Sequence, residues 1–258
     1  MLPSSLEVVF TKLAETLEKI SWKDFDSWQK KDSSLVTSLD LQLQNRIIDI
    51  LQTAYPSHNL LYEEGEQKHM GKSSKFTWII DPIDGTANMA KGKREFGSSI
   101  GLMYNNQFIA AIVAFPRYNE TYTAVQGTGV FKNGYKFPAI PPGSGRKEIV
   151  LCSKSYPGLK QLLRSGGDTV SCYYCATYSM LKVLKGEAYL YHTINTKIYD
   201  VGPMAFILSQ LGANIYDGSA SPIGFRPSLD RIPFFIAAAD AQLARKFIAN
   251  IKKTGNRP

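Results

Sequence analysis

Two aspartates stand three residues apart in the segment Trp78–Thr86, directly after a short run of hydrophobic residues. The run has the composition of a buried strand, and Pro82 and Gly85 allow the chain to turn sharply after it. Asp81 and Asp84 held this close repel each other unless a cation lies between them or one of them binds a proton. Carboxylate oxygens suit Mg²⁺, Mn²⁺ or Ca²⁺ better than Zn²⁺. The segment therefore predicts a site for a divalent cation. The simpler alternative is that these residues only form a turn after the strand.

Further carboxylates border other apolar segments of the chain. Glu63 and Glu64 end the run Leu60–Tyr62, and Asp200 precedes an apolar helical pattern. Each of these is weak evidence alone, because paired glutamates are frequent on surfaces and an aspartate before a helix can be a plain N-cap. Together with the first pair of aspartates, they are enough to bind more than one divalent ion.

The residues after the first pair suggest what such ions would do. Gly85-Thr86 can begin a helix, whose N–H groups and positive dipole end would hold a phosphate beside the metal ions. One ion would lower the pKa of a bound water, and another would stabilise the leaving oxygen of a phosphoryl transfer. Positioning and charge neutralisation would then carry most of the catalysis. The residues themselves thus indicate a metal-dependent phosphomonoesterase.

Elements that could position these residues can be predicted from the hydrophobic pattern. Residues 6–20 and 39–51 have the periodicity of amphipathic helices, with a polar break between them. The apolar runs over 59–62 and 76–80 are too short for helices and end on acidic residues, as strands that lead to a site would. From 97 to 130 the pattern predicts antiparallel strands.

A boundary is expected in segment 137–146, which contains three prolines and two glycines. Beyond it, short apolar runs alternate with helical patterns, which is typical of an α/β arrangement. We therefore expect residues 1–140 to form an α+β half with an antiparallel sheet that carries most of the metal ligands. Residues 146–258 would form an α/β half that supplies Asp200 and the substrate pocket.

The composition excludes several classes of protein. The chain has 258 residues, of which 44% are hydrophobic, and a net charge of +8. This hydrophobic fraction is too high for a disordered chain. The longest apolar stretch, 108–115, is far shorter than the ~20 residues that span a bilayer, so no membrane partner is expected. The basic surplus favours an anionic partner. Because it forms no long cluster, a phosphorylated small molecule is expected and a nucleic acid is not.

Three cysteines, Cys152, Cys172 and Cys175, are few and odd in number. This fits a reducing cytoplasm better than an oxidising compartment, so a cytoplasmic location is predicted. No second cysteine pair or histidine cluster completes a zinc site around Cys172 and Cys175. We interpret them as core thiols, with zinc binding or redox chemistry as the lesser alternative.

The segment Asp81-Pro82-Ile83-Asp84-Gly85-Thr86 resembles the signature of the inositol monophosphatase family, a Mg²⁺-dependent, lithium-sensitive group of phosphatases. The resemblance extends over nearly the whole chain, through Leu35–Asp40, Glu63-Glu64, the glycines of 127–134 and Tyr199-Asp200. The length and the 192–200 loop look most like the inositol monophosphatase-type proteins of low-GC Gram-positive bacteria. The resemblance implies a layered αβαβα sandwich that is usually a homodimer.

The resemblance also implies metal ligands for two to three Mg²⁺ ions, for which Mn²⁺ could substitute. Glu63, Asp81 and the carbonyl of Ile83 would hold the first ion. Asp81, Asp84 and Asp200 would hold the second, which makes Asp84 one of the catalytic residues.

Other roles follow from the same resemblance. Glu63 with Glu64 would help to place a third ion. Thr86 and Glu63 would orient and activate the attacking water, with Asp40 close to that water. The N–H groups of Gly85 and Thr86 would bind the substrate phosphate.

The chain departs from its relatives where substrates are recognised. A Gly-(Ser/Thr)-Ala-Ala segment that usually lines the pocket reads Tyr174-Cys175-Ala176-Thr177 here, and Pro203 follows Asp200 where relatives have no proline. Many relatives have a glutamate near His192 that binds a sugar hydroxyl, and none stands there in this chain. His192 is interpreted equally well as a substrate contact or as a polar residue that closes a strand. The residues expected to face the substrate are Gly85, Thr86, Cys175, Ala176, His192 and Asp200.

Three functions remain open at this point. The first is hydrolysis of a small sugar or polyol phosphate such as inositol-1-phosphate. The second is hydrolysis of a nucleotide such as adenosine bisphosphate or NADP, whose ring Tyr174 or Tyr199 could stack on. The third, less favoured, is a binding or regulatory protein that keeps the fold without turnover.

Overall fold

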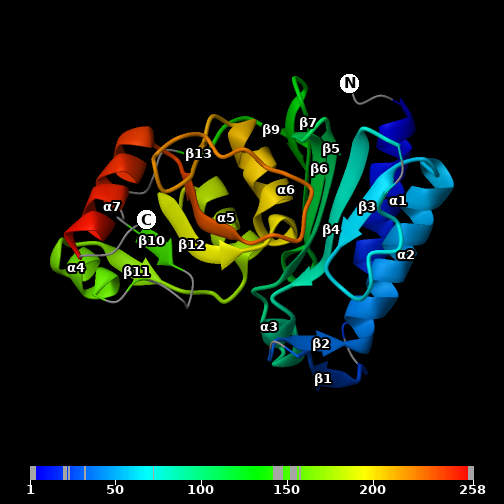
Figure 1. Ribbon diagram of the computed structural model, residues 1–258, viewed down its shortest axis with the longest axis horizontal. Helices are drawn as coiled ribbons and strands as arrows, with labels where there is room; N and C mark the ends of the chain where they lie inside the picture. The colour runs from blue at the N-terminus through cyan, green and yellow to red at the C-terminus, as the bar shows by residue number, and fades with distance from the viewer. Residues whose placement is uncertain are drawn as a thin grey trace.

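The computed structural model describes the chain apart from residues 1–3, 20–21, 23, 32, 72, 142–147, 152–155, 157 and 255–258. The described residues form five layers in the order helices, sheet, helices, sheet, helices (Figure 1). The predicted αβαβα sandwich is confirmed. The interpretation of Cys152 falls outside the described residues. No described helix is both long enough and apolar enough to cross a membrane.

The first two layers come from the N-terminal part of the chain. Helices α1 (Ser4–Lys19) and α2 (Ser38–Ala54) lie on one face of a seven-stranded sheet. Its strands, neighbours in chain order, are β3 (Asn59–Tyr62), β4 (Phe76–Asp84), β5 (Gly97–Tyr104), β6 (Gln107–Phe115), β7 (Glu120–Val125), β8 (Gly129–Lys132) and β9 (Tyr135–Phe137). All neighbouring pairs are antiparallel except β3 and β4, which are parallel. The predicted helices and antiparallel strands are confirmed.

Helix α2 begins at a capping box, which fixes where its first residues lie. The Thr37 hydroxyl accepts the Asp40 N–H, and the Asp40 carboxylate accepts the Thr37 N–H at 2.8 Å. Leu43 and Ile47 on the inner face of the helix are fully buried against Trp78 of β4. This packing places the buried carboxylate of Asp40 next to the end of β4.

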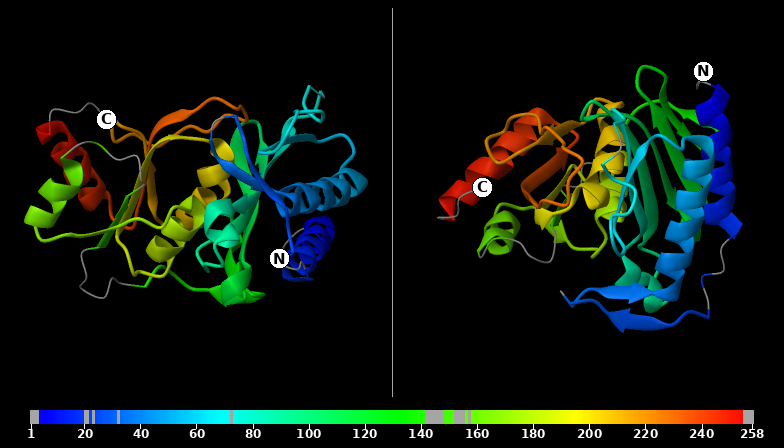
Figure 2. Two further views of the ribbon diagram at one scale, coloured as in Figure 1. Left: turned by 90° about the horizontal axis from the view of Figure 1, so that it is seen from below. Right: turned by 45° about the vertical axis from the view of Figure 1, so that its right-hand side comes forward.

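The stretch between α1 and α2, interpreted as a polar break, contains a hairpin. Strands β1 (Ser27–Gln29) and β2 (Leu35–Thr37) pair antiparallel in a sheet of their own. The Lys30 N–H donates to the Ser34 carbonyl at 2.8 Å and closes the turn. The hairpin lies beyond the first turn of α2, beside the short helix α3 (Thr86–Ala90) (Figure 2). The sequence analysis did not predict this hairpin, because its strands have only three residues each.

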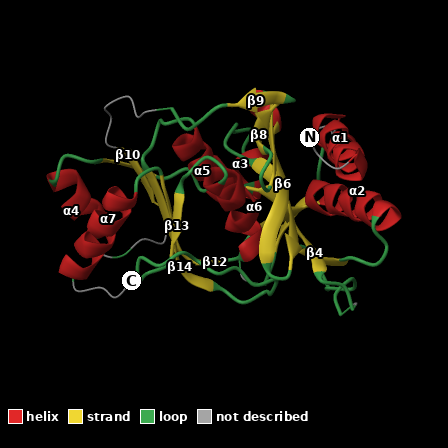
Figure 3. Cartoon of the chain, turned by 90° about the horizontal axis from the view of Figure 1, so that it is seen from above, coloured by secondary structure: helices red, strands yellow, loops and turns green. Residues whose placement is uncertain are grey.

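The remaining layers come from the C-terminal part of the chain (Figure 3). The second sheet has the order β11-β10-β12-β14-β13. Its strands are β10 (Glu148–Leu151), β11 (Thr169–Ser171), β12 (Leu190–Thr196), β13 (Asn214–Tyr216) and β14 (Ile232–Ala238), and the helices are α4 (Leu159–Ser165), α5 (Ala176–Leu184), α6 (Ile198–Ser209) and α7 (Ala241–Lys253). The predicted alternation of strands and helices is confirmed. The expected boundary in segment 137–146 stays a prediction, since residues 142–147 lie outside the described part of the chain.

Helices α5 and α6 fill the layer between the two sheets and join them in one hydrophobic core (Figure 1). Ile79 and Val113 of the first sheet, Met204 of α6 and Phe235 of the second sheet belong to the same buried cluster. Gly202 allows α6 to approach the first sheet closely, because a Cβ atom there would lie 2.5 Å from the Phe108 ring. The core therefore holds the start of α6 against the first sheet.

A group of partly buried ion pairs also connects the first sheet to the end of α5. Glu120 of β7 binds Lys132 at 2.7 Å and Lys185, which follows α5, at 2.8 Å. Burial raises the pKa of Glu120, but the two lysines outweigh burial and leave the pKa below its ordinary value of 4.5. The Glu120 carboxylate therefore binds a proton less tightly in the folded protein than in the unfolded chain. The group's stabilisation is complete above the ordinary pKa and is lost as the pH falls through the lower folded pKa.

We predict that Glu120→Gln lowers the free energy of unfolding by about 1–2 kcal/mol at neutral pH, because it removes a charge from two partly buried ion pairs. The difference from wild type should shrink as the pH falls below the ordinary pKa of glutamate. Urea unfolding at several pH values measures it. Glu15→Gln is the matched control, because its ion pair with Lys19 is exposed. A difference that does not depend on pH would contradict the assignment.

Candidate active site

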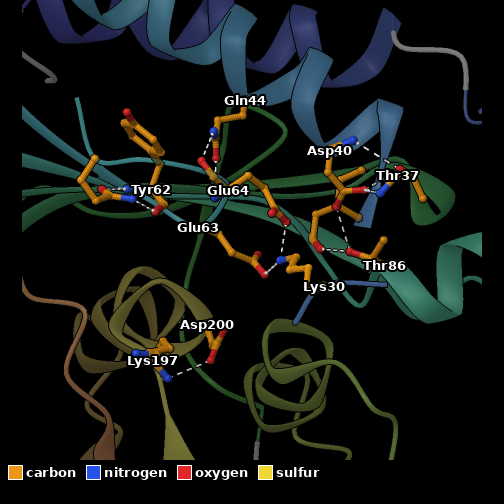
Figure 4. A network of polar contacts seen from close by, with 12 residues as sticks. Lys30, Thr37, Asp40, Gln44, Tyr62, Glu63, Glu64, Thr86, Lys197 and Asp200 are labelled. Atoms are coloured by element: carbon orange, nitrogen blue, oxygen red, sulfur yellow. Dashed lines mark hydrogen bonds and ion pairs between the residues drawn. The ribbon is translucent and has the colours of Figure 1, made fainter. Parts of the chain in front are cut away.

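Glu63 and Asp81 lie at the same edge of the first sheet because β3 and β4 are parallel neighbours. Glu63 follows the end of β3, and its N–H donates to the Ile80 carbonyl at 3.2 Å. The register of β4 against β5 shifts between Asp81 and Asp84, which turns the chain away from the sheet. Asp200 approaches the same edge from α6, opposite Glu63 (Figure 4). The fold thus brings together four carboxylates from three separate segments of the sequence.

Asp81 is the most constrained of these groups. It is 1% exposed, and neither carboxylate oxygen has a hydrogen-bond partner among the described residues. Burial raises its pKa well above the ordinary value, and the nearby charges of Glu63, Asp84 and Asp200 raise it further. A buried carboxylate without donors is costly unless a cation neutralises it. Asp81 therefore has the properties expected of a ligand to a divalent metal ion.

Asp84 and Asp200 each have one oxygen bound by the protein. The Asp84 Oδ2 atom accepts hydrogen bonds from the N–H and the hydroxyl of Thr177, and the Asp200 Oδ2 atom accepts them from the Lys197 N–H and the Thr196 hydroxyl, both at 2.8 Å. Burial raises the pKa of Asp84 to about 6. Burial, with Asp84 and Glu63 nearby, raises that of Asp200 to about 7. Both remain available to a cation through the second oxygen.

The position of Asp200 differs in one respect from the sequence prediction. Helix α6 begins at Ile198, so Asp200 lies inside the first helical turn and does not precede the helix. Pro203 also lies within α6 and does not displace its start. Pro203 is the sixth residue of α6 and lacks the N–H that would bond to the Tyr199 carbonyl, so it costs the helix one backbone hydrogen bond.

Lys30 is a site residue that the sequence analysis missed. Its ammonium lies 2.7 Å from Glu63 Oε1 and 2.6 Å from Glu64 Oε1 (Figure 4). Burial lowers the pKa of Lys30, but the two carboxylates outweigh burial and leave it above the ordinary value. Burial and the neighbouring Glu63 raise the pKa of Glu64 to about 7 despite this ion pair. Only the hairpin turn brings Lys30 here, so no local sequence signal indicated it.

The described acidic residues do not form a complete set of ligands around one metal position. Among the described residues, no three His, Cys, Asp or Glu side chains are grouped so as to hold an ion. The ammonium of Lys30 instead compensates Glu63 and Glu64. The donor set nevertheless consists of oxygen atoms alone, as Mg²⁺ prefers. Binding of an ion at Glu63 would require the ammonium to move aside.

A hydroxyl group adjoins the acidic residues. Thr86 Oγ1 lies 2.8 Å from Asp40 Oδ1 and 2.9 Å from the Ile83 carbonyl, and its single proton can be donated to one of them. The other oxygen of Asp40 accepts the N–H and hydroxyl of Thr37. Burial raises the pKa of Asp40. A Thr86 hydroxyl that donates to Asp40 keeps its lone pairs free to accept a hydrogen bond from a water.

Gly85 connects this hydroxyl to the second half of the protein. It caps α3 with φ = +88°, and a Cβ atom there would lie 3.0 Å from both Cys175 Cβ and the Glu95 carbonyl. Cys175 is buried and Ala176 is the first residue of α5. The predicted residues Gly85, Thr86, Cys175 and Ala176 thus lie beside Asp84, whereas Tyr174 is 66% exposed next to them.

His192 lies elsewhere, and the expectation that it faces the substrate is wrong. Side chains alternate along β12, so Tyr191 joins the core around α5 and α6 while His192 points to the other face. There its ring packs on Phe234 and on Phe247 of α7, and Nδ1 bonds to the Phe235 carbonyl at 2.9 Å. Burial lowers its pKa to about 4, so it is neutral at neutral pH. It is the polar strand residue of the alternative interpretation.

The sequence profile of the inositol monophosphatase family matches residues 5–254. The chain belongs to this family. The Nus factor SuhB of Salmonella typhimurium is 36% identical over 108 residues, which are 42% of this chain and 40% of that protein. The inositol-1-monophosphatase of Bacillus subtilis is 26% identical over 202 residues, 75% of this chain and 76% of that protein.

Solved structures of the family have the same fold as this chain. One, an IMPase/NADP phosphatase complexed with Mg²⁺ and phosphate, is 22% identical with a TM-score of 0.76, over 96% of this chain and 92% of that one. A family member thus binds Mg²⁺. At this identity the likeness establishes the fold of the chain and leaves its activity to be argued.

We predict that Lys30→Met lowers the melting temperature of the metal-free protein by about 2–5 °C, because two partly buried glutamates lose their cation. Mg²⁺ should then raise the melting temperature more in the variant than in wild type, since it replaces the missing charge without displacing an ammonium. Thermal unfolding with and without Mg²⁺ measures both effects. Lys31→Met, in the same turn but exposed, is the control. Equal Mg²⁺ shifts in all three proteins would contradict this role for Lys30.

Proposed function

We propose that this protein is a Mg²⁺-dependent phosphomonoesterase that hydrolyses a small sugar or polyol phosphate, such as inositol-1-phosphate. The observation that carries the proposal is Asp81, a buried carboxylate with no protein donor, which lies beside Glu63, Asp84 and Asp200. This concentration of negative charge fits divalent cations, and the Thr86 hydroxyl adjoins it. We infer that the protein binds two to three such ions and that Mn²⁺ can substitute.

Each ion is assigned to residues that the fold brings together. Glu63, Asp81 and the Ile83 carbonyl would hold the first, and Asp81, Asp84 and Asp200 the second. Glu64 would take part in a third once Lys30 moves aside. When bound, the ions supply a water of lowered pKa and neutralise the charge of the leaving oxygen.

The protein's own groups would orient the reaction. The Thr86 hydroxyl, which donates its proton to Asp40, would accept a hydrogen bond from the attacking water and so orient that water, with Glu63 next to it. The N–H groups of Gly85 and Thr86, at the start of α3, would bind the substrate phosphate. The rest of the substrate would contact Cys175, Ala176 and Asp200.

The relatives support the class of reaction and leave the substrate open. The Bacillus subtilis protein is named an inositol-1-monophosphatase, and the Mg²⁺-bound structure an IMPase/NADP phosphatase. The second name favours nucleotides as an alternative substrate class, and the exposed ring of Tyr174 beside the site suits a nucleobase.

A regulatory role is the other candidate, because relatives matching 42% of this chain are named Nus factors. The carboxylates argue against it as the sole role, because nothing in binding a partner requires an unpartnered carboxylate at Asp81. A homodimer, a cytoplasmic location and sensitivity to lithium are further inferences from the family resemblance.

We predict that the purified protein releases phosphate from inositol-1-phosphate, fructose bisphosphate, adenosine bisphosphate or NADP only when Mg²⁺ is present. Asp84→Asn should lower kcat/KM at least about 100-fold, because the variant loses a metal ligand. Phosphate assays across the panel measure both effects, and the best substrate by kcat/KM decides between polyol and nucleotide.

Asp240→Asn is the control, since Asp240 caps the distant helix α7 and should leave the activity unchanged. Release that persists without Mg²⁺, or that survives Asp84→Asn, would contradict the proposal. No release from any substrate by folded, Mg²⁺-bound protein would favour the regulatory role.

A further inference from the structure

The anchoring of Asp84 differs from that of the other carboxylates because it comes from the opposite half of the protein. Asp84 ends β4 in the first sheet, whereas its donors lie at the start of α5. Asp84 Oδ2 accepts the Thr177 N–H at 2.5 Å, the Thr177 hydroxyl at 2.8 Å and the Cys175 thiol at 3.2 Å. The bonds to Asp200 Oδ2, in contrast, come from residues three and four positions before it.

The segment that carries these donors is itself fixed to the first half. The Asn88 side chain of α3 donates to the Tyr173 carbonyl at 2.7 Å, and Cys175 packs against the position where a Cβ of Gly85 would be. Cys175 also accepts the Tyr178 N–H as the N-cap of α5. Thr177 is fully buried. The start of α5 therefore cannot swing away from Asp84 without breaking several contacts.

We propose that Thr177 is a positioning residue for metal binding: its hydroxyl and N–H together hold Asp84 Oδ2 so that Oδ1 alone faces the cation. The inference rests on the proposed function, since it assumes that Asp84 is a metal ligand. Each donor on one oxygen restricts the rotation of the carboxylate plane, and the Thr177 hydroxyl at 2.8 Å lies closer to Asp84 Oδ2 than the Cys175 thiol at 3.2 Å. Thr177 thereby connects α5 of the C-terminal half to the metal ligands of the first sheet.

The hydroxyl is the part of this contact that mutation can remove. Thr177→Val keeps the N–H donor and the shape of the side chain but deletes the Oγ1 bond to Asp84. Thr177→Ser keeps the hydroxyl and deletes only a methyl group. Thr128→Ala is the matched control, because it removes a threonine hydroxyl bond to a carbonyl, Val125, at a turn of the first sheet.

The test measures Mn²⁺ affinity at equilibrium, by calorimetry and by electron paramagnetic resonance of free Mn²⁺, on the full-length protein. Thr177→Val should raise the dissociation constant of the Asp84-dependent site about 10-fold. Thr177→Ser should stay within about twofold of wild type, and Thr128→Ala should not differ from it. Asp84→Asn identifies which binding event belongs to this site. Melting temperatures show that each variant is folded, and Thr177→Ala serves if the valine variant is not.

The two proposals fail in different ways in this experiment. Asp84-dependent binding with the same affinity in Thr177→Val, Thr177→Ala and wild type would overturn the positioning role and leave the proposed function intact. A loss of affinity that Thr177→Ser does not prevent would also overturn it, because packing would then be the cause. If wild type bound no Mn²⁺ in an Asp84-dependent manner, the proposed function would fall together with the inference.

Discussion

Repulsion among buried carboxylates is the constraint on which the candidate active site of this protein depends. Asp81 is buried with no donor on either oxygen, and the charges of Glu63, Asp84 and Asp200 add to the cost of ionising it. The ammonium of Lys30 neutralises part of this negative charge, but it pairs with Glu63 and Glu64 and not with Asp81. A bound divalent cation would remove the remaining cost. The same electrostatics that disfavour the empty arrangement would therefore drive metal binding.

Like charges can be held together in this way only because hydrophobic packing holds the surrounding elements. The core that joins the first sheet, the α5–α6 layer and the second sheet is buried throughout. Gly202 brings α6 close to the first sheet, and the start of α5 is tied to α3 through Asn88. Each half supplies carboxylates or their donors, so the site exists only where the halves meet. The distances within the site are therefore set by the packing of the surrounding helices.

The success of the sequence predictions depended on how local each signal was. Asp81 and Asp84 follow a strand within one short segment, so composition and spacing were enough to indicate a cation site. Asp200 was singled out as a carboxylate before an apolar helical pattern, its role as a metal ligand came from the family resemblance, and its place inside α6 came from the structure. His192 was misjudged because the face of a strand to which a side chain points depends on what covers the sheet. Lys30 was missed because a hairpin of three-residue strands carries almost no periodic pattern.

By itself, the sequence determined the family and, through that resemblance, the αβαβα architecture. The acidic residues and the oxygen chemistry that they share followed from residue type and spacing over short segments. Tertiary structure alone decided which oxygen of each carboxylate is bound. It also decided that Lys30 lies between Glu63 and Glu64, and that Thr177 holds Asp84 from the other half. The contacts of Lys30 and Thr177 join residues tens of positions apart. Their distances are set by how the layers pack, and no local pattern of side chains records that packing.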